Sequence, residues 1–147
     1  MWPQEGVRNP LARHLSMGPL RILVADDSES VRNAVRDILK SESDWEVCGE
    51  ARNGDEAVLR ARELSPDIIV MDIKMPNRNG IDATREIVRA APDTRVLIMT
   101  VYDFPELYGE ARSAGALGFV LKGSSGRSLI PAIRCLAERK PYFPDAH

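Results

Sequence analysis

Five side chains that can do chemistry stand at the ends of four apolar runs in this sequence of 147 residues. In chain order they are two adjacent carboxylates, a third carboxylate, a hydroxyl and an amine: Asp26 and Asp27, Asp72, Thr100, and Lys122. Three carboxylates brought together repel one another and raise one another's pKa values unless a cation lies among them. Oxygen ligands of this kind suit Mg²⁺, which keeps several waters and takes one or two protein carboxylates.

The apolar runs themselves predict strands that are buried on both faces. The clearest run, Ile68 to Met71, lies between Pro66-Asp67 and Pro76. Asp72 would then lie at the carboxyl edge of a sheet, where ligands of open α/β folds bind. Plainer interpretations stay open: Asp72 can start a turn, and the pair Asp26-Asp27 can cap a helix. Thr100 can be an ordinary β-branched strand residue.

Amphipathic helical patterns alternate with the strand patterns along the chain. A weaker strand pattern at residues 45–51 brings the count to five strands, each followed by a helical stretch. Short links between alternating strands and helices predict βαβ units, and hence a parallel sheet covered on both faces. In the last helical stretch we expect Ser124 or Ser125 as the cap. If that helix starts near Ser128, Pro131 lies in its first turn, where proline is tolerated.

Taken in order on four strand ends, these residues resemble the receiver domain of bacterial two-component response regulators. The segment MDIKMPNRNG, residues 71–80, looks like the phosphorylation-site loop of that family, and GALGFVLKGSS, residues 115–125, looks like its fifth strand and lysine turn. The resemblance covers residues 20–140. It implies a flavodoxin-like, doubly wound (βα)5 fold with a five-stranded parallel sheet of order 2-1-3-4-5.

The resemblance also implies a role for each carboxylate. Asp72 is the expected phosphoacceptor, because a carboxylate can attack phosphorus and hold an acyl phosphate. The expected Mg²⁺ ligands are Asp27 directly, Asp26 through water or as electrostatic support, Asp72, and the backbone carbonyl of Lys74. The metal would neutralise charge and align the oxygens of an in-line displacement.

Three further residues are expected to respond to the phosphoryl group. Lys122 would pair with Asp72 at rest and with a phosphoryl oxygen afterwards, while the Thr100 hydroxyl would bind another. Phe119 stands at the family's switch position, where Tyr is frequent, and would fill the space that Thr100 vacates. Gly123 follows the lysine where the family usually has proline, often after a cis bond. A cis bond before a non-proline residue costs about 2.5–4 kcal/mol, so the sequence leaves this isomer open.

The predicted function is therefore a phosphorylation switch. We expect a sensor histidine kinase, or a small acyl phosphate, to phosphorylate Asp72 in a Mg²⁺-dependent step that changes self-association or partner binding. The tail resembles the linker of the NarL/FixJ subfamily, whose LuxR-type output domain regulates transcription. That effector domain is absent from this chain, so we expect either part of a longer transcription factor or a stand-alone receiver.

Other classes of protein remain as alternatives. A phosphatase or phosphotransferase with an aspartyl phosphate would want a second acid shortly after the nucleophile, where Lys74 stands, so no turnover of an external substrate is expected. A flavodoxin-like electron carrier would need a phosphate-cradling loop after the first strand, where Asp26-Asp27 would repel phosphate. A docking module that is never phosphorylated stays open.

Composition bounds the partners and the organisation of the chain. The net charge is −2, without a basic block, so we expect no direct binding of nucleic acid. No apolar run approaches the length of a membrane span, and the spacing of Cys48 and Cys135 suits neither a metal nor a disulfide framework, which favours the cytoplasm. We expect a flexible tail at 1–18, the receiver at 19–140 and a linker at 141–147.

Overall fold

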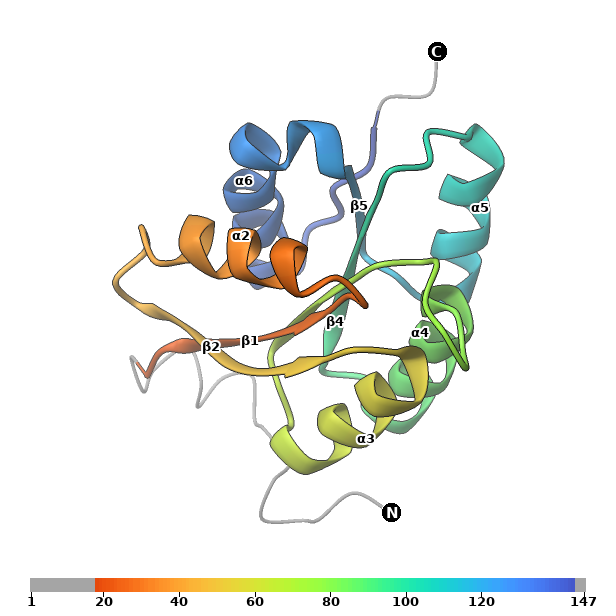
Figure 1. Cartoon of the computed structure of the whole chain (residues 1–147), viewed down its shortest axis with the longest axis horizontal. Coiled ribbons are helices and arrows are strands. Elements are labelled where there is room, and N and C mark those ends of the chain that lie inside the picture. The colour runs from red at the N-terminus through yellow and green to blue at the C-terminus, as the bar shows by residue number, and fades with distance from the viewer. Residues whose placement is uncertain (1–17, 145–147) are drawn as a thin grey trace.

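Five strands form one parallel sheet with helices on both of its faces (Figure 1). This is a computed structural model, and it describes residues 18–144. The elements, in chain order, are β1 (Leu20–Ala25), α2 (Glu29–Leu39), β2 (Trp45–Ala51), α3 (Gly54–Leu64), β3 (Ile68–Met71), α4 (Gly80–Ala90), β4 (Arg95–Thr100), α5 (Pro105–Ala114), β5 (Gly118–Leu121), the 3-10 turn η2 (Lys122–Ser124) and α6 (Ser125–Ala137).

The strand order is β2-β1-β3-β4-β5, and every pair is parallel. This confirms the predicted doubly wound fold and its order 2-1-3-4-5. The register places Ala25 of β1 opposite Met71 of β3, so the residues that follow these two strands meet at one edge. The ladder continues past β3, because the Asp72 N–H donates to the Ala25 carbonyl at 2.9 Å. The carboxyl edge of the sheet therefore collects the predicted site residues.

Each face of the sheet has its own apolar core. Helices α2 and α6 lie over one face and α3, α4 and α5 over the other (Figure 1). The first core includes Ile22, Val24 and Val70, and the second includes Leu23, Ile69 and Phe119. Successive residues of a strand point to opposite faces, so a continuous apolar run fills both cores.

Side-chain caps fix where three helices begin, and thereby the loops that precede them. The side chains of Ser28, Asn53 and Asn79 accept the N–H groups of Val31, Glu56 and Asp82 at the start of α2, α3 and α4. Such a cap is worth about 1 kcal/mol. Two of the capped helices, α2 and α4, follow the strands that carry the acidic residues, so the caps hold the loops of the site.

The prediction that Pro131 lies in the first turn of the last helix is wrong. That helix starts at Ser125, directly after η2, and Pro131 lies inside it. Proline has no N–H to donate to the carbonyl four residues earlier. Ser124 occupies the N-cap position without a side-chain cap bond, and the Ser125 hydroxyl donates to the Lys122 carbonyl at 2.9 Å. This hydrogen bond belongs to the turn at Lys122, and the helix begins there, three residues before the expected start at Ser128.

The chain returns to the sheet after α6. Tyr142 forms a parallel bridge with Gly118 of β5, so part of the predicted linker lies against the domain. We call residues 141–144 the docked tail. The predicted N-terminal tail, apart from Gly18, and the last three residues of the predicted linker lie outside the described residues. Within residues 18–144, no helix is long and apolar enough to cross a membrane.

Candidate functional site

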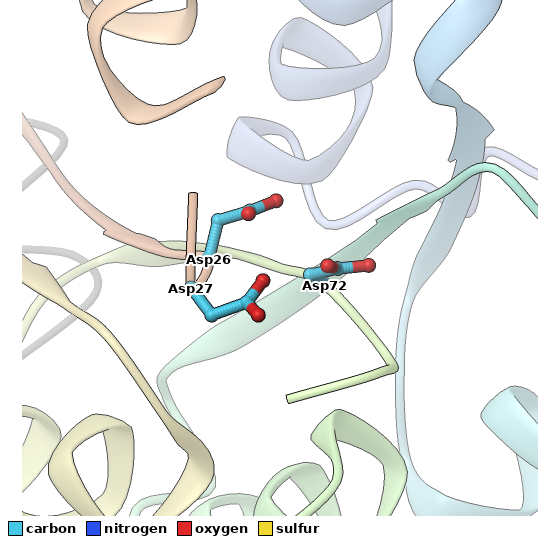
Figure 2. Close-up of side chains that lie close together, drawn as sticks. All are labelled: Asp26, Asp27 and Asp72. Carbon is cyan, nitrogen blue, oxygen red and sulfur yellow. The ribbon is translucent and has the colours of Figure 1, made fainter. Parts of the chain in front are cut away.

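Three carboxylates meet at the carboxyl edge of the sheet, as Figure 2 shows. One oxygen from each of Asp26, Asp27 and Asp72 lies within 4.8 Å of the others. Asp26 and Asp72 are buried, whereas Asp27 is exposed. The three carboxylates therefore form the cluster that the sequence predicted, and solvent reaches it through Asp27.

An ammonium group lies between the two buried carboxylates. Lys122 Nζ is 2.8 Å from Asp26 Oδ2 and 3.1 Å from Asp72 Oδ2. The turn η2, which begins at Lys122, directs the side chain, and every peptide bond within residues 18–144 is trans, including Lys122–Gly123. The bond whose isomer the sequence left open is therefore trans. Lys122 pairs with Asp26 as closely as with Asp72.

Backbone N–H groups fix the other oxygen of each buried carboxylate. Asp26 Oδ1 accepts the Ser28 N–H at 2.9 Å, and Asp72 Oδ1 accepts the Ile73 N–H at 2.8 Å. Because these oxygens are held from the backbone, the Oδ2 atoms are the ones that face Lys122. The orientation of Asp72 thus leaves one defined oxygen toward the centre of the cluster.

The loop after Asp72 closes tightly on the site. The Gly80 N–H donates to the Ile73 carbonyl at 2.7 Å. A Cβ added at Gly80 would lie 1.8 Å from the Asp72 carbonyl oxygen, so no other residue fits without moving the loop. Asn77 provides the reversal with φ 70°, a conformation that asparagine tolerates better than most residues. Lys74, whose carbonyl is the predicted fourth ligand, lies exposed in this loop.

The surroundings raise the pKa of Asp72 to about 6. Burial is the largest cause and the charge of Asp26 is the second, while Lys122 acts in the opposite direction. Partial burial by itself lowers the pKa of Lys122, but the hydrogen bond to Asp26 and the charge of Asp72 outweigh it, so this pKa is raised. One ammonium therefore leaves negative charge uncompensated among three carboxylates. The donor set, all oxygen and partly open to solvent, fits a hydrated Mg²⁺.

The predicted switch residues lie on the two neighbouring strands. Thr100, at the end of β4, is fully buried, and its hydroxyl oxygen accepts the Tyr102 N–H at 3.3 Å. Phe119 on β5 is also fully buried, with its ring edge-on to Tyr108 of α5 at 4.6 Å between centroids. From the sequence we expected Phe119 to move inward after phosphorylation, whereas its side chain is already buried, in the inward position, in this structure.

A buried arginine of α2, which the sequence did not single out, supports the site. Arg32 of α2 is buried, and its guanidinium donates to the Asp26 carbonyl at 2.8 Å and pairs with Glu50 of β2 at 2.7 Å. It therefore ties the strand end that carries Asp26 to the neighbouring strand. The sequence gives little indication of this role, because an arginine next to the apolar stripe of a helix usually keeps its charged end in water.

Comparison with known proteins gives one consistent result. The family model described as the response regulator receiver domain matches residues 22–134. The chain belongs to this family. Its relatives include the uncharacterized transcriptional regulatory protein YxjL of Bacillus subtilis, 37% identical over 124 residues, which cover 84% of this chain and 57% of that protein. The response regulator GacA of Pseudomonas protegens is 36% identical, over 84% of this chain and 58% of that protein.

Solved structures agree with this receiver assignment. A two-component response regulator of the LuxR family from Aurantimonas sp. superposes with a TM-score of 0.81 at 34% identity, covering 85% of this chain and 89% of that one. The predicted resemblance is therefore confirmed. Receiver domains bind Mg²⁺ at an acidic pocket, interact with histidine kinases and can dimerise. The chain spans a little over half the length of the curated relatives that it matches, YxjL and GacA.

Proposed function

We propose that Asp72 is the phosphoacceptor of this receiver domain. The observation that carries the proposal is the arrangement around one oxygen: Asp72 Oδ2 faces Lys122 at 3.1 Å, beside Asp26 and Asp27, while Oδ1 is held by the Ile73 N–H. Such an oxygen is fixed in direction and lies next to groups that handle phosphoryl charge. If Asp72 only started a turn, its carboxylate would not require a lysine and two further carboxylates beside it.

The chain's own residues then divide the work of phosphoryl transfer. Asp72 Oδ2 forms the new bond to phosphorus while the bond from phosphorus to the donor's histidine nitrogen breaks, and the released histidine can take up a proton. Lys122 leaves Asp72 and pairs with a phosphoryl oxygen, and the Thr100 hydroxyl donates to another. Bound Mg²⁺ supplies neutralisation of the phosphoryl charge.

The metal ligands proposed are Asp26, Asp27, Asp72 and the Lys74 carbonyl. Two features support them: one oxygen from each carboxylate lies within 4.8 Å of the others, and the pKa of Asp72 is raised, chiefly by burial and then by the charge of Asp26. Asp27, the exposed member, is proposed as a direct ligand, and Asp26, which is paired with Lys122, as a ligand through water or as electrostatic support.

The partners follow from the family and from the named relatives. We propose a sensor histidine kinase as phosphodonor, self-association on phosphorylation, and control of transcription through an effector domain. The site is proposed to turn over no external substrate, and the residues described here are proposed to leave DNA binding to the effector. A cytoplasmic location is proposed on the same grounds.

Phosphate-affinity electrophoresis of the chain after acetyl phosphate treatment tests the phosphoacceptor. We expect one slowly migrating band that requires Mg²⁺ and disappears in Asp72→Asn. The matched control is Asp37→Asn on α2, an exposed carboxylate 75% accessible to solvent, which should label like the unmodified chain. A shifted band that persists in Asp72→Asn would show that another residue is the acceptor.

A further inference from the structure

The docked tail adds a short parallel strand to the open edge of the sheet. The Tyr142 N–H donates to the Leu117 carbonyl at 3.0 Å, and the Phe119 N–H donates to the Tyr142 carbonyl at 2.8 Å. The next donor of such a ladder would be residue 144, which is proline and has no N–H. The sequence thus limits the pairing to one bridge, which suits a contact that can open.

A sharp reversal after α6 aims the tail at this edge. Arg139 has φ 62°, the left-handed conformation usually taken by glycine. The Lys140 N–H returns to the Cys135 carbonyl at 2.8 Å and the Arg139 N–H to the Leu136 carbonyl at 2.9 Å, which together form a Schellman motif. Pro141 follows and prevents the helix from continuing. The reversal is therefore built into the end of α6.

Close approach of the tail depends on a residue without a side chain. A Cβ at Gly118 would lie 2.8 Å from Leu97 Cδ1, 2.9 Å from Leu136 Cδ1 and 3.1 Å from the Tyr142 carbonyl oxygen. Glycine at this place lets α6 and the tail both approach β5. The edge of β5 is thus shaped to receive the tail.

The tail contacts the two elements that surround the switch aromatic. Its partner on β5 is the N–H of Phe119 itself. On the other side, the Phe143 ring packs against the core that contains Phe119 and lies under the Arg112 guanidinium of α5, 4.1 Å from the ring centroid. Helix α5 also supplies Tyr108, which contacts the Phe119 ring. Phe119, Tyr142 and Phe143 line one groove of about 420 Å³.

We propose that the docked tail holds Phe119 in its inward position, so that tail docking and occupation of the phosphoacceptor site strengthen each other. The inference rests on the proposed function. In that function a phosphoryl group draws Thr100 toward Asp72 and favours the inward Phe119. The tail is bound to the backbone of Phe119 while the ring is inward, so both events select one conformation. Coupling of this kind is reciprocal.

Amide exchange measured by NMR on the whole chain tests this coupling. Beryllofluoride with Mg²⁺ serves as the probe of the phosphoacceptor site. In the unmodified chain we expect the Phe119 and Tyr142 N–H groups to be protected, and their protection to rise at least about fivefold with the probe, a typical lower bound for coupled sites. By reciprocity, Tyr142→Pro, which removes the Tyr142 N–H, should weaken beryllofluoride binding by about the same factor.

Two further variants separate coupling from damage to the fold. Tyr142→Phe keeps the backbone bridge and should bind the probe like the unmodified chain. Phe143→Ala leaves the backbone donors in place and removes the ring beside Arg112, so it should weaken probe binding in the same direction as Tyr142→Pro while circular dichroism stays native.

The outcomes distinguish the two levels of the proposal. Tight probe binding with no change in the exchange of Phe119, and equal affinity in Tyr142→Pro and Phe143→Ala, would overturn the coupling and leave the phosphoacceptor standing. Failure of the unmodified chain to bind the probe would overturn the phosphoacceptor, and the coupling with it. Rapid exchange of both N–H groups without the probe would overturn tail docking itself.

Discussion

The two edges of the sheet carry buried charge in opposite ways. At the amino edge, Asp67 is buried and its Oδ2 accepts the Arg21 N–H at 2.8 Å, while its backbone joins β1 to β4 through bonds to Arg21 and Arg95. At the carboxyl edge, Asp26 and Asp72 face each other across one ammonium. The carboxylate at the amino edge holds strands together. The carboxyl edge instead gathers three carboxylates around one ammonium.

Arginines at the amino edge complete the contrast. The Arg21 guanidinium donates to the carbonyls of Leu64 and Ser65 at the end of α3. The Arg95 guanidinium donates to the carbonyls of Leu136 and Ala137 at the end of α6, at 3.0 and 3.2 Å. Cations at helix carboxyl ends satisfy free carbonyls and the helix dipole. The amino edge is thus a structural joint, and the difference indicates which buried charges to test for function.

Replacing Lys122 with methionine should change the binding of cations and of anions at the carboxyl edge in opposite directions. Loss of the ammonium between Asp26 and Asp72 should tighten Mg²⁺ binding about tenfold, because the ammonium repels Mg²⁺ and pairs with the same carboxylate oxygens. The same change should weaken beryllofluoride binding by more than about tenfold, because an anion loses its cationic partner. Calorimetric titration measures both affinities.

The matched change at the amino edge is Arg95→Gln. It removes a cation that donates to carbonyls at the end of α6, at the opposite edge of the sheet from the acidic cluster. Mg²⁺ affinity should stay unchanged while the chain becomes less stable. Equal shifts of Mg²⁺ affinity in the two variants would erase the distinction between the edges.

The pH dependence of stability should report Asp72. Its pKa is raised from 3.8 to about 6 in the folded chain, so folding favours the protonated form. The stabilisation is therefore complete below about pH 4 and is lost as the pH rises through 6. Since one pKa unit corresponds to about 1.4 kcal/mol, the loss is on the order of 2–3 kcal/mol. Urea denaturation without Mg²⁺ from pH 4 to pH 8 measures it.

Asp72→Asn isolates that contribution. The variant should lack the loss between pH 4 and pH 7 and should be more stable than the unmodified chain at pH 8. The slope should persist in Asp67→Ala, which changes the amino edge only. An unaltered slope in Asp72→Asn would assign the raised pKa to another group.

Asp67→Ala should cost about 2 kcal/mol of unfolding free energy. It leaves the Arg21 N–H without its acceptor in a partly buried place, a loss typically of about 1–3 kcal/mol. Labelling by acetyl phosphate should remain normal. Thermal and urea denaturation give the first result and electrophoresis the second, and impaired labelling in a folded variant would show that the amino edge also serves the site.

Arg139→Gly should give the smallest effect, a gain of about 0.5–1 kcal/mol, because glycine adopts the left-handed conformation without strain. The variant gives up one exposed ion pair with Asp93, at 3.6 Å, which is worth little. Urea denaturation measures the gain, and unchanged beryllofluoride affinity is expected. A loss of stability would mean that Arg139 contributes more than its conformation suggests.

The sequence predicted the site better than it predicted what supports it. Asp26, Asp72 and Lys122 were predicted to lie together because each follows a strand, and parallel strands bring such ends to one edge, where the structure has them. Asp67 precedes a strand and marked only its boundary in the sequence. Nothing in the local pattern shows that its carboxylate accepts the N–H of the distant Arg21. The position of Pro131 was missed because the bonds of the lysine turn, not helix propensity, decide where α6 starts.

The docking of Tyr142 could not be predicted for a related reason. Two prolines in four residues indicate a linker by local rules. The pairing depends on a distant glycine, Gly118, and on the strained φ of Arg139, which a local pattern does not reveal. Contacts between segments far apart in the sequence override local preference.

The covered edge of β5 also has a consequence for synthesis on the ribosome. A chain grows from its amino terminus at about 5–20 residues per second, and β5 is made about twenty residues before Tyr142, so translation leaves its outer edge bare for about a second or more. Bare edge strands are templates for aggregation. The bridge between Tyr142 and Gly118 therefore covers this edge late in folding, and a delay between the emergence of β5 and of Tyr142 from the ribosome would lengthen the interval in which neighbouring nascent chains can add to the sheet.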